Sequence, residues 1–403
     1  DPRNMDDARR LALPIGKGGE PLSALRDDVR PDGVLRRARA QVLVGTVEQQ
    51  VYDGLVASLN AGGYEFSATV EEEEARSGQN PGSLEFPYDW RRDIVESARD
   101  LDAFIERKAK QVERVRTERY GRSIPADQMR FDFVAHSMGA LVVRYWLMYG
   151  GADLPEDGST PELTWAGAKR AACVVFVAPP NFGSATALEN LVMGRSFGPL
   201  QPFYPPALLG TLPSAYQLMP RDRHRRARLG AWEGEPVSAI YDPDTWERWG
   251  WGLLDPGQDA TLATLMPDAP DRAARLSRAR GHLEKCLARA DALHRAIDRS
   301  GEPRTTDLFL VVGTGLDTPA TAVVDEDTGR VSVSSREEGD GVVLRSSALM
   351  DERLSGGGGD RGRPIRYRTT LLLPGEHVEL TRNAVFADNL LHWLLDAPRR
   401  RAA

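Results

Sequence analysis

The chain has 403 residues, enough for one large α/β domain with inserted segments or for two smaller domains. Its formal net charge of -7 argues against nucleic-acid binding, because phosphate recognition needs a concentrated positive face. No stretch reaches the roughly 18 apolar residues of a membrane span, so we do not expect an integral membrane protein, and contact with a lipid surface stays open.

The first 40 residues are polar and show no clear period, so we expect an irregular segment there. The chain starts at Asp1 with neither an initiator methionine nor a signal peptide, which suggests a fragment or a processed form. A cytoplasmic location is the corresponding expectation. A short strand at 41–45 and a helix at 47–61 are expected next, and Gly62–Gly63 ends that helix.

The middle of the chain alternates between helical and strand patterns. At 92–119 apolar residues recur every three or four positions, which predicts an amphipathic helix of about seven turns, either continuous or broken once. The β-rich run 131–135 predicts a strand, 138–149 a helix, and 172–177 a second buried strand.

The C-terminal part continues this alternation, with a strand at 308–312, a hairpin of 321–325 and 330–334, a strand at 367–373 and a helix at 384–395. The whole pattern predicts an α/β fold, a mostly parallel sheet with helices on both faces. We divide the chain into an irregular segment (1–40), two parts of an α/β core (41–178 and 306–396), an inserted cap or lid (179–305) and a basic tail (397–403).

Ser137 lies between the strand 131–135 and the helix 138–149, in the sequence AHSMGA. A serine hydroxyl becomes a useful nucleophile when it is exposed, oriented and placed next to a base. A sharp strand-to-helix turn provides the first two conditions, and the small residues Ala135 and Gly139 fit the relaxed form of its G-x-S-x-G signature. Ser137 is therefore the candidate nucleophile, with a purely structural serine as the alternative.

The same turn directs the backbone N–H of Met138 toward the place where negative charge would develop on a reacting carbonyl oxygen. Met138 is therefore the candidate oxyanion residue. His136 directly precedes the serine and is not expected to act as its base, because adjacent side chains point apart. We expect it to pack beside the site.

Six motifs in order resemble the lecithin:cholesterol acyltransferase family, including its bacterial lipase-like and acyltransferase-like members. They are FPYDWRRD at 86–93, AHSMGALVVRYW at 135–146, FVAPPNFGSATAL at 176–188, LPSAYQLMP at 212–220, GDGVV at 339–343 and EHVEL at 376–380. The resemblance implies an α/β-hydrolase fold with an inserted cap, a serine acyl-enzyme and lipid ester substrates.

Carried over by position, the resemblance implies a triad of Ser137, Asp340 and His377. The order serine, acid, histidine along the chain is that of α/β-hydrolases in general. Two other late histidines are less suited, because His294 lies inside a helical pattern and His392 lies in the last helix. His377 follows a strand and a Pro-Gly turn, the kind of loop that carries a catalytic base.

The residues alone leave two candidates for the acid. Asp317 follows the strand 308–312 closely, and Asp340 lies between two glycines after the hairpin. The resemblance decides for Asp340, whose carboxylate would fix the tautomer of the histidine. Asp89 and Arg91 in the YDWR motif are interpreted as structural partners of each other or of nearby backbone, with a substrate contact as the alternative.

Family members carry an upstream strand whose Pro-Gly loop supplies the first oxyanion N–H. We find no match for it in 1–40, so the chain is expected to begin just after that element. A missing oxyanion donor costs about 100- to 1000-fold in rate, unless another loop takes its place.

The insertion is rich in apolar residues between 181 and 215, and prolines at 199, 202, 205 and 206 interrupt them. This pattern fits a cap with its own core as well as a mobile lid over an acyl-chain pocket. Phe182, Leu188 and Phe203 are the candidate substrate-binding residues. Trp246, Trp249 and Trp251 are expected in the cap core, with an interfacial contact as the alternative.

The resemblance and the candidate residues together predict a serine-dependent acyl-ester hydrolase or O-acyltransferase acting on lipid esters. The alternatives are an esterase of small non-lipid esters and a catalytically impaired binding module. Neither a cofactor nor a metal is expected, because the two cysteines are far apart and no Cys/His constellation is present. The oligomeric state is left open.

Overall fold

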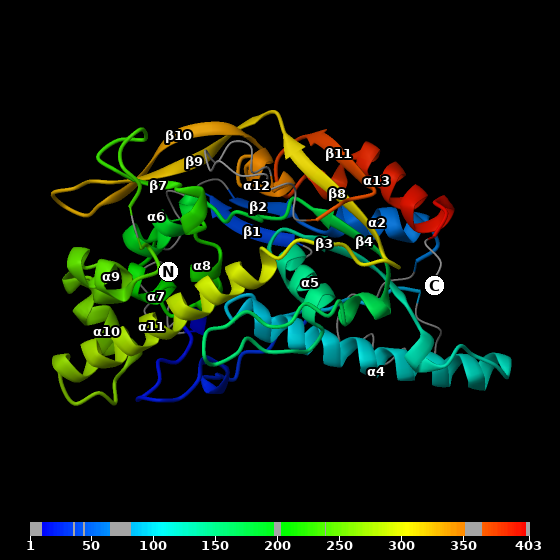
Figure 1. Cartoon of the computed structure of the whole chain (residues 1–403), viewed down its shortest axis with the longest axis horizontal. Helices are drawn as coiled ribbons and strands as arrows, with labels where there is room; N and C mark the ends of the chain where they lie inside the picture. Colours follow the sequence, from blue (N-terminus) through cyan, green and yellow to red (C-terminus); the bar gives the residue numbers. More distant parts are fainter. Residues whose placement is uncertain are drawn as a thin grey trace.

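A computed structural model describes residues 10–34, 37–42, 45–64, 82–196, 203–237, 239–350 and 365–399. Its centre is a four-stranded parallel sheet in the order β11-β8-β4-β3 (Figure 1). The strands are β3 (Phe131–His136), β4 (Ala171–Val177), β8 (Asp307–Thr314) and β11 (Thr369–Pro374). All four lie where the hydrophobic runs predict strands, so the predicted α/β class is confirmed.

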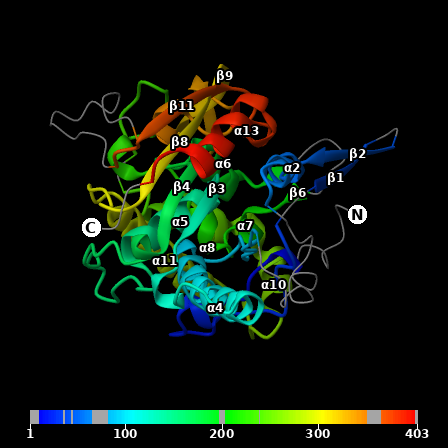
Figure 2. The same cartoon turned by 90° about the vertical axis from the view of Figure 1, so that its right-hand side faces the viewer.

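Helices cover both faces of this sheet (Figure 2). On one face, Val174 and Phe176 of β4 pack with α4 (Ile94–Tyr120) and α5 (Met138–Tyr149). On the other face, Cys173, Val175 and Val177 pack with α2 (Asp53–Ala61) and α13 (Ala384–Leu391). Both faces of β4 are apolar because a parallel strand between two helical layers has no solvent-facing side.

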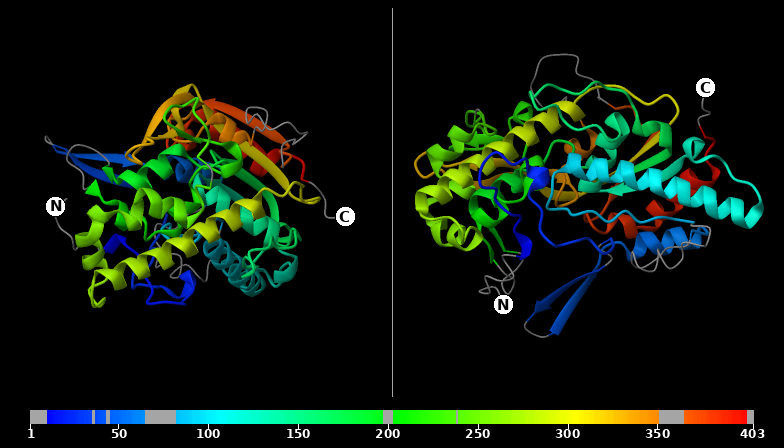
Figure 3. Two further views of the ribbon diagram at one scale, coloured as in Figure 1. Left: turned by 60° about the vertical axis from the view of Figure 1, so that its left-hand side comes forward. Right: turned by 90° about the horizontal axis from the view of Figure 1, so that it is seen from below.

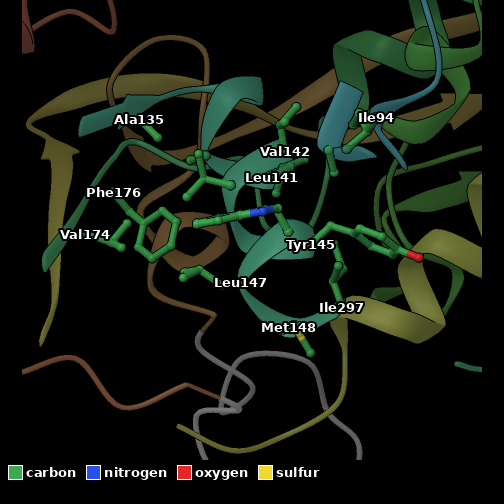
Figure 4. Close-up of a cluster of buried hydrophobic side chains, with 14 of the residues drawn as sticks. Ile94, Ala135, Leu141, Val142, Tyr145, Leu147, Met148, Val174, Phe176 and Ile297 are labelled. Atoms are coloured by element: carbon green, nitrogen blue, oxygen red, sulfur yellow. The ribbon is translucent and has the colours of Figure 1, made fainter. Parts of the chain in front are cut away.

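The helix α4 forms without a break, close to the range that its apolar spacing predicts. Asp93 begins it by accepting a hydrogen bond from the N–H of Val95, and Gly121 ends it with a left-handed φ of 68°. Its apolar side and that of α5 belong to one cluster, which includes Ile94, Leu141, Val142 and Tyr145 (Figure 4). This packing fixes the helix that follows Ser137.

The region before α2 differs from the prediction. In place of a strand at 41–45 and a helix from 47, β1 (Arg37–Val42) and β2 (Gly45–Gln50) form an antiparallel hairpin. The hairpin projects from the rest of the chain (Figure 3). Residues 45–50 therefore pair their backbone with the neighbouring strand, and the helix begins only at Asp53.

The YDWR motif holds the N-terminal segment in place. The buried guanidinium of Arg91 donates hydrogen bonds to Asp89 and Asp27, and also to the carbonyl oxygens of Arg10 and Leu11. Its predicted structural role, pairing with Asp89 and nearby backbone, is confirmed.

The segment between β4 and β8 forms a helical layer beside the sheet. Its helices of five or more residues are α6 (Ala185–Met193), α8 (Pro213–Gln217), α9 (Pro243–Trp249), α10 (Asp259–Leu265) and α11 (Arg272–Ile297). They share a core with a smaller sheet of order β10-β9-β7, made of β7 (Ala227–Leu229), β9 (Leu316–Val324) and β10 (Val331–Gly339). The predicted hairpin is thus present and longer than expected.

Trp246 and Trp251 are buried in this core, and Trp249 stacks on Trp251 with ring centroids 4.7 Å apart. The core interpretation of these tryptophans is confirmed. No helix in the described ranges is both long enough and apolar enough to cross a membrane.

The C-terminal helix ends earlier than expected. Regular α-helix stops at Leu391, and a wider π-helical turn follows at His392–Asp396. The N–H of Ala397 closes this turn on the carbonyl oxygen of His392, five residues back, directly before Pro398.

Asp93 joins the helical layer of the insertion to the core. Its carboxylate accepts hydrogen bonds from Gln217 of α8 (2.7 Å) and Arg289 of α11 (2.6 Å), besides capping α4. We expect Asp93→Ala to lower the free energy of unfolding by about 3 kcal/mol, because it removes the buried acceptor of Arg289 Nε and of the Gln217 amide together with the cap of α4, while Arg289 keeps only its contact with Asp153. Urea unfolding measures this. The matched control is Asp271→Ala, which removes the exposed cap of α11 and should cost about 1 kcal/mol; equal losses would contradict the linking role.

Two buried histidines predict a loss of stability in mild acid. Burial lowers the pKa of His282 to about 4 and that of His294 to about 3. In the unfolded chain a histidine has a pKa of about 6.5. At a pH between the folded-state pKa and this value, the unfolded chain therefore binds more protons than the folded chain. The free energy of unfolding should therefore fall as the pH drops below about 6.5, by up to about 1.4 kcal/mol per pH unit for each histidine.

Urea unfolding at about pH 7, 6 and 5 checks this dependence. His294→Gln keeps a donor for the carbonyl oxygen of Gln217, 2.8 Å from the imidazole Nε2, and should make the slope shallower. His392→Gln, on an exposed side chain, should leave the slope unchanged. A slope that all three proteins share would show that the buried histidine does not cause it.

Candidate active site

Ser137 occupies a strained turn at the end of β3. Its backbone has φ 54° and ψ -130°, an unusual conformation for a residue with a side chain. The N–H of Ser137 donates to the carbonyl oxygen of Val177 on β4 at 2.9 Å, and the helix α5 begins at the next residue. The sheet and the buried helix together hold this conformation, which is the strand–turn–helix geometry that the sequence predicts for a nucleophile elbow.

His377 lies beside this serine, although 240 residues separate them. Its Nε2 is 2.8 Å from Ser137 Oγ, and its Nδ1 is 2.8 Å from Asp340 Oδ2. A carboxylate only accepts hydrogen bonds, so Nδ1 carries the proton in the neutral ring. Nε2 is then free to accept the hydroxyl proton of Ser137.

Asp340 is held rigidly in the turn after β10. One of its carboxylate oxygens accepts from the N–H groups of Val342 and Val343, at 3.0 and 2.7 Å, and the other faces His377. The carbonyl oxygen of Asp340 also accepts from the N–H of His377 at 3.0 Å. The residue is almost fully buried, so the acid and the imidazole meet out of contact with bulk water.

The other candidates for base and acid lie elsewhere. His294 is buried in α11 and bonded to the carbonyl oxygen of Gln217, whereas His392 is exposed next to Asp396. Asp317 is exposed near the start of β9. Of the late histidines and the two acids, the structure brings only His377 and Asp340 together with Ser137.

Two hydrogen-bond donors lie close to the turn of Ser137. The N–H of Met138 is the first of α5, so no acceptor lies one turn back within the helix. The hydroxyl of Tyr88 lies 3.5 Å from the position that a Cβ on Gly139 would take. Burial raises the pKa of Tyr88, so this hydroxyl stays a donor. A methyl group at Gly139 would make an ordinary van der Waals contact with the Tyr88 hydroxyl. The elbow therefore requires a small residue at this position less strictly than the G-x-S-x-G signature suggests.

The candidate substrate-binding residues lie in different surroundings. Leu188 is fully buried in the core of the insertion, where it packs that layer and presents no surface to a substrate. Phe182 is also buried, with its ring 3.6 Å from that of His224. Phe203 is 53% exposed. Residues 197–202, with Pro199 and Pro202, lie outside the described part of the chain, whereas Pro205 and Pro206 stand at the start of the short helix α7 (Pro206–Leu209).

The sequence indicates no role for Tyr52, and for His136 it indicates only packing beside the site. In the structure His136 contacts the carbonyl oxygen of His377, and Tyr52 contacts His136. The position of His136 next to the serine is the one signal that marks it. Tyr52 carries none, because its partner is 84 residues away. In the described ranges no group of three or more His, Cys, Asp or Glu residues could hold a metal ion.

The parallel sheet, the elbow and the serine–histidine–aspartate arrangement define an α/β-hydrolase fold. Residues 36–233 match the model of the lecithin:cholesterol acyltransferase family, which confirms the resemblance found in the sequence. The chain is also similar to one chain of the crystal structure of the Tle4–Tli4 complex, with a TM-score of 0.55 and 15% sequence identity over 87% of this chain and 80% of that chain. Comparison with curated proteins gives no match. Together the family match and the fold support an acyltransferase- or lipase-type enzyme.

Proposed function

We propose that the protein cleaves or transfers the acyl group of a lipid ester through an acyl-enzyme on Ser137. The observation that carries this proposal is the chain of two 2.8 Å contacts, from Ser137 Oγ to His377 and from His377 to Asp340. The lipid nature of the ester rests on the family match.

In the first half-reaction the hydroxyl proton of Ser137 passes to His377 Nε2 while Oγ bonds to the ester carbonyl carbon. The carbonyl oxygen becomes negative and accepts hydrogen bonds at the start of α5, where Met138 N–H points. Asp340 stabilises the imidazolium without taking its proton. The bond to the alcohol then breaks, His377 protonates that alcohol, and the acyl group stays on Ser137.

In the second half-reaction His377 takes a proton from an incoming hydroxyl group, whose oxygen attacks the acyl carbon. Water as the attacking molecule releases a fatty acid, and an acceptor alcohol gives a new ester. In both cases the bond between the acyl carbon and Ser137 Oγ then breaks, and His377 returns its proton to Oγ, which regenerates the serine hydroxyl. The same residues serve hydrolysis and transfer, and the acceptor decides between them.

A chain-length series of p-nitrophenyl esters tests this function, with Ser137→Ala as the blank. We expect long acyl chains to be cleaved faster than acetate, and a supplied long-chain alcohol to divert part of the acyl group from free acid to ester. Preference for acetate would show instead an esterase of small substrates. Equal rates for wild type and Ser137→Ala would overturn the proposal.

A further inference from the structure

His136 joins the nucleophile strand to the loop of the candidate base. Its Nε2 is 3.1 Å from the carbonyl oxygen of His377, and its Nδ1 is 2.9 Å from the hydroxyl of Tyr52. The two imidazole rings lie 4.6 Å apart between centroids. Three segments far apart in the sequence therefore meet at one buried side chain.

The chemistry of the partners fixes the direction of both hydrogen bonds. A carbonyl oxygen only accepts, so Nε2 of His136 carries the proton and donates to His377. Nδ1 then has a lone pair and accepts the proton of the Tyr52 hydroxyl. Burial lowers the pKa of His136 to about 3 and raises that of Tyr52 to about 12, so the chain of hydrogen bonds stays neutral over the usual pH range.

Further contacts tie the Tyr52 region to the same loop. Thr381, four residues after His377, contacts the carbonyl oxygen of Val51 through its hydroxyl at 3.4 Å. A Cβ on Gly54 would lie only 2.5 Å from the side chain of Arg382, so the start of α2 and the loop pack closely. Tyr52 is therefore anchored where it can hold His136.

We propose that His136, oriented by Tyr52, is a positioning residue that sets the distance between the imidazole of His377 and the hydroxyl of Ser137. This inference rests on the proposed function. His136 is next to Ser137 in the chain, so its hydrogen bond couples the loop of the base directly to the strand of the nucleophile. A displacement of about 1 Å between reacting groups can cost 100-fold in rate. Because His136 is neutral, it acts through position and not through charge.

The rate of inactivation by a fluorophosphonate tests this role in the whole chain, with urea unfolding measured beside it. His136→Leu removes both hydrogen bonds and should slow inactivation by about 10- to 100-fold. His136→Gln can donate to His377 and accept from Tyr52, and should stay within about threefold of wild type. Tyr52→Phe removes one donor and should slow inactivation by about 3- to 10-fold.

The matched control is Tyr149→Phe. Like Tyr52→Phe, it removes a hydroxyl that donates one hydrogen bond, in this case to the carbonyl oxygen of Ala296 at the far end of α5. It should lower stability without slowing inactivation. Equal rates for His136→Leu and His136→Gln, or an unchanged rate for Tyr52→Phe, would overturn the positioning role. If His136→Leu does not fold, the comparison of the inactivation rates of Tyr52→Phe and Tyr149→Phe tests the positioning role.

These failures are separate from failure of the proposed function. If the wild type is not modified at Ser137, the acyl-enzyme proposal fails. If the wild type is modified at Ser137 and the His136 and Tyr52 variants are inactivated as fast as the wild type, only the positioning role fails.

Discussion

Ser137→Ala should reduce ester cleavage by about a millionfold, to the level of general binding effects. Alanine keeps the Cβ and the strained turn but has no oxygen to attack the ester or to donate a proton to His377. The free energy of unfolding should change by less than about 1 kcal/mol, because a single neutral hydrogen bond is lost. Initial rates with a long-chain p-nitrophenyl ester and urea unfolding measure the two quantities.

The control for this change is Ser277→Ala, on an exposed position of α11. It should leave both the rate and the stability unchanged. A blank without protein gives the background rate. If Ser137→Ala still cleaved the ester well above this background, the role of Ser137 as nucleophile would be contradicted.

Asp340→Asn should reduce ester cleavage by about 10⁴-fold while the fold stays intact. The amide oxygen of asparagine can still accept from the N–H groups of Val342 and Val343, so the turn is preserved. The amide nitrogen then faces His377 Nδ1 and donates to it, which moves the imidazole proton to Nε2. In that tautomer Nε2 can no longer accept the proton of Ser137.

Asp317→Asn is the matched control, because Asp317 was the competing acid in the sequence and is exposed in the structure. We expect its activity to equal that of wild type. If Asp317→Asn lost activity and Asp340→Asn kept it, Asp317 and not Asp340 would be the acid of the triad.

Much of the fold could be predicted because the hydrophobic periods are strong. The strands β3, β4, β8 and β11 and the helices α4 and α5 lie within a few residues of their predicted bounds. Buried parallel strands give continuous apolar runs, and α4 has both a cap at Asp93 and a stop at Gly121.

The β1–β2 hairpin could not be predicted, because its structure depends on pairing between two short segments. The pattern of 47–61 resembles a helix over its whole length, yet 45–50 pairs with 37–42 instead. Pairing of this kind overrides local propensity.

At the candidate site, the serine and its turn were predicted from the sequence alone, and chain order with the loop context favoured His377. The choice between Asp317 and Asp340 needed the family resemblance, since both follow a strand. The contacts of His136 and Tyr52 could not be predicted, because each joins residues 84 or more positions apart. Leu188 was expected at the substrate and lies in the core, because apolar periodicity does not distinguish a pocket from a core.

The most direct test is to treat the folded protein with a fluorophosphonate and to map the modified peptide by mass spectrometry, alongside Ser137→Ala and His377→Ala. We predict modification of wild type at Ser137, none at this position in Ser137→Ala, and slowing by at least about 1000-fold in His377→Ala. Modification of another residue, or the same rate in wild type and His377→Ala, would contradict activation of Ser137 by His377.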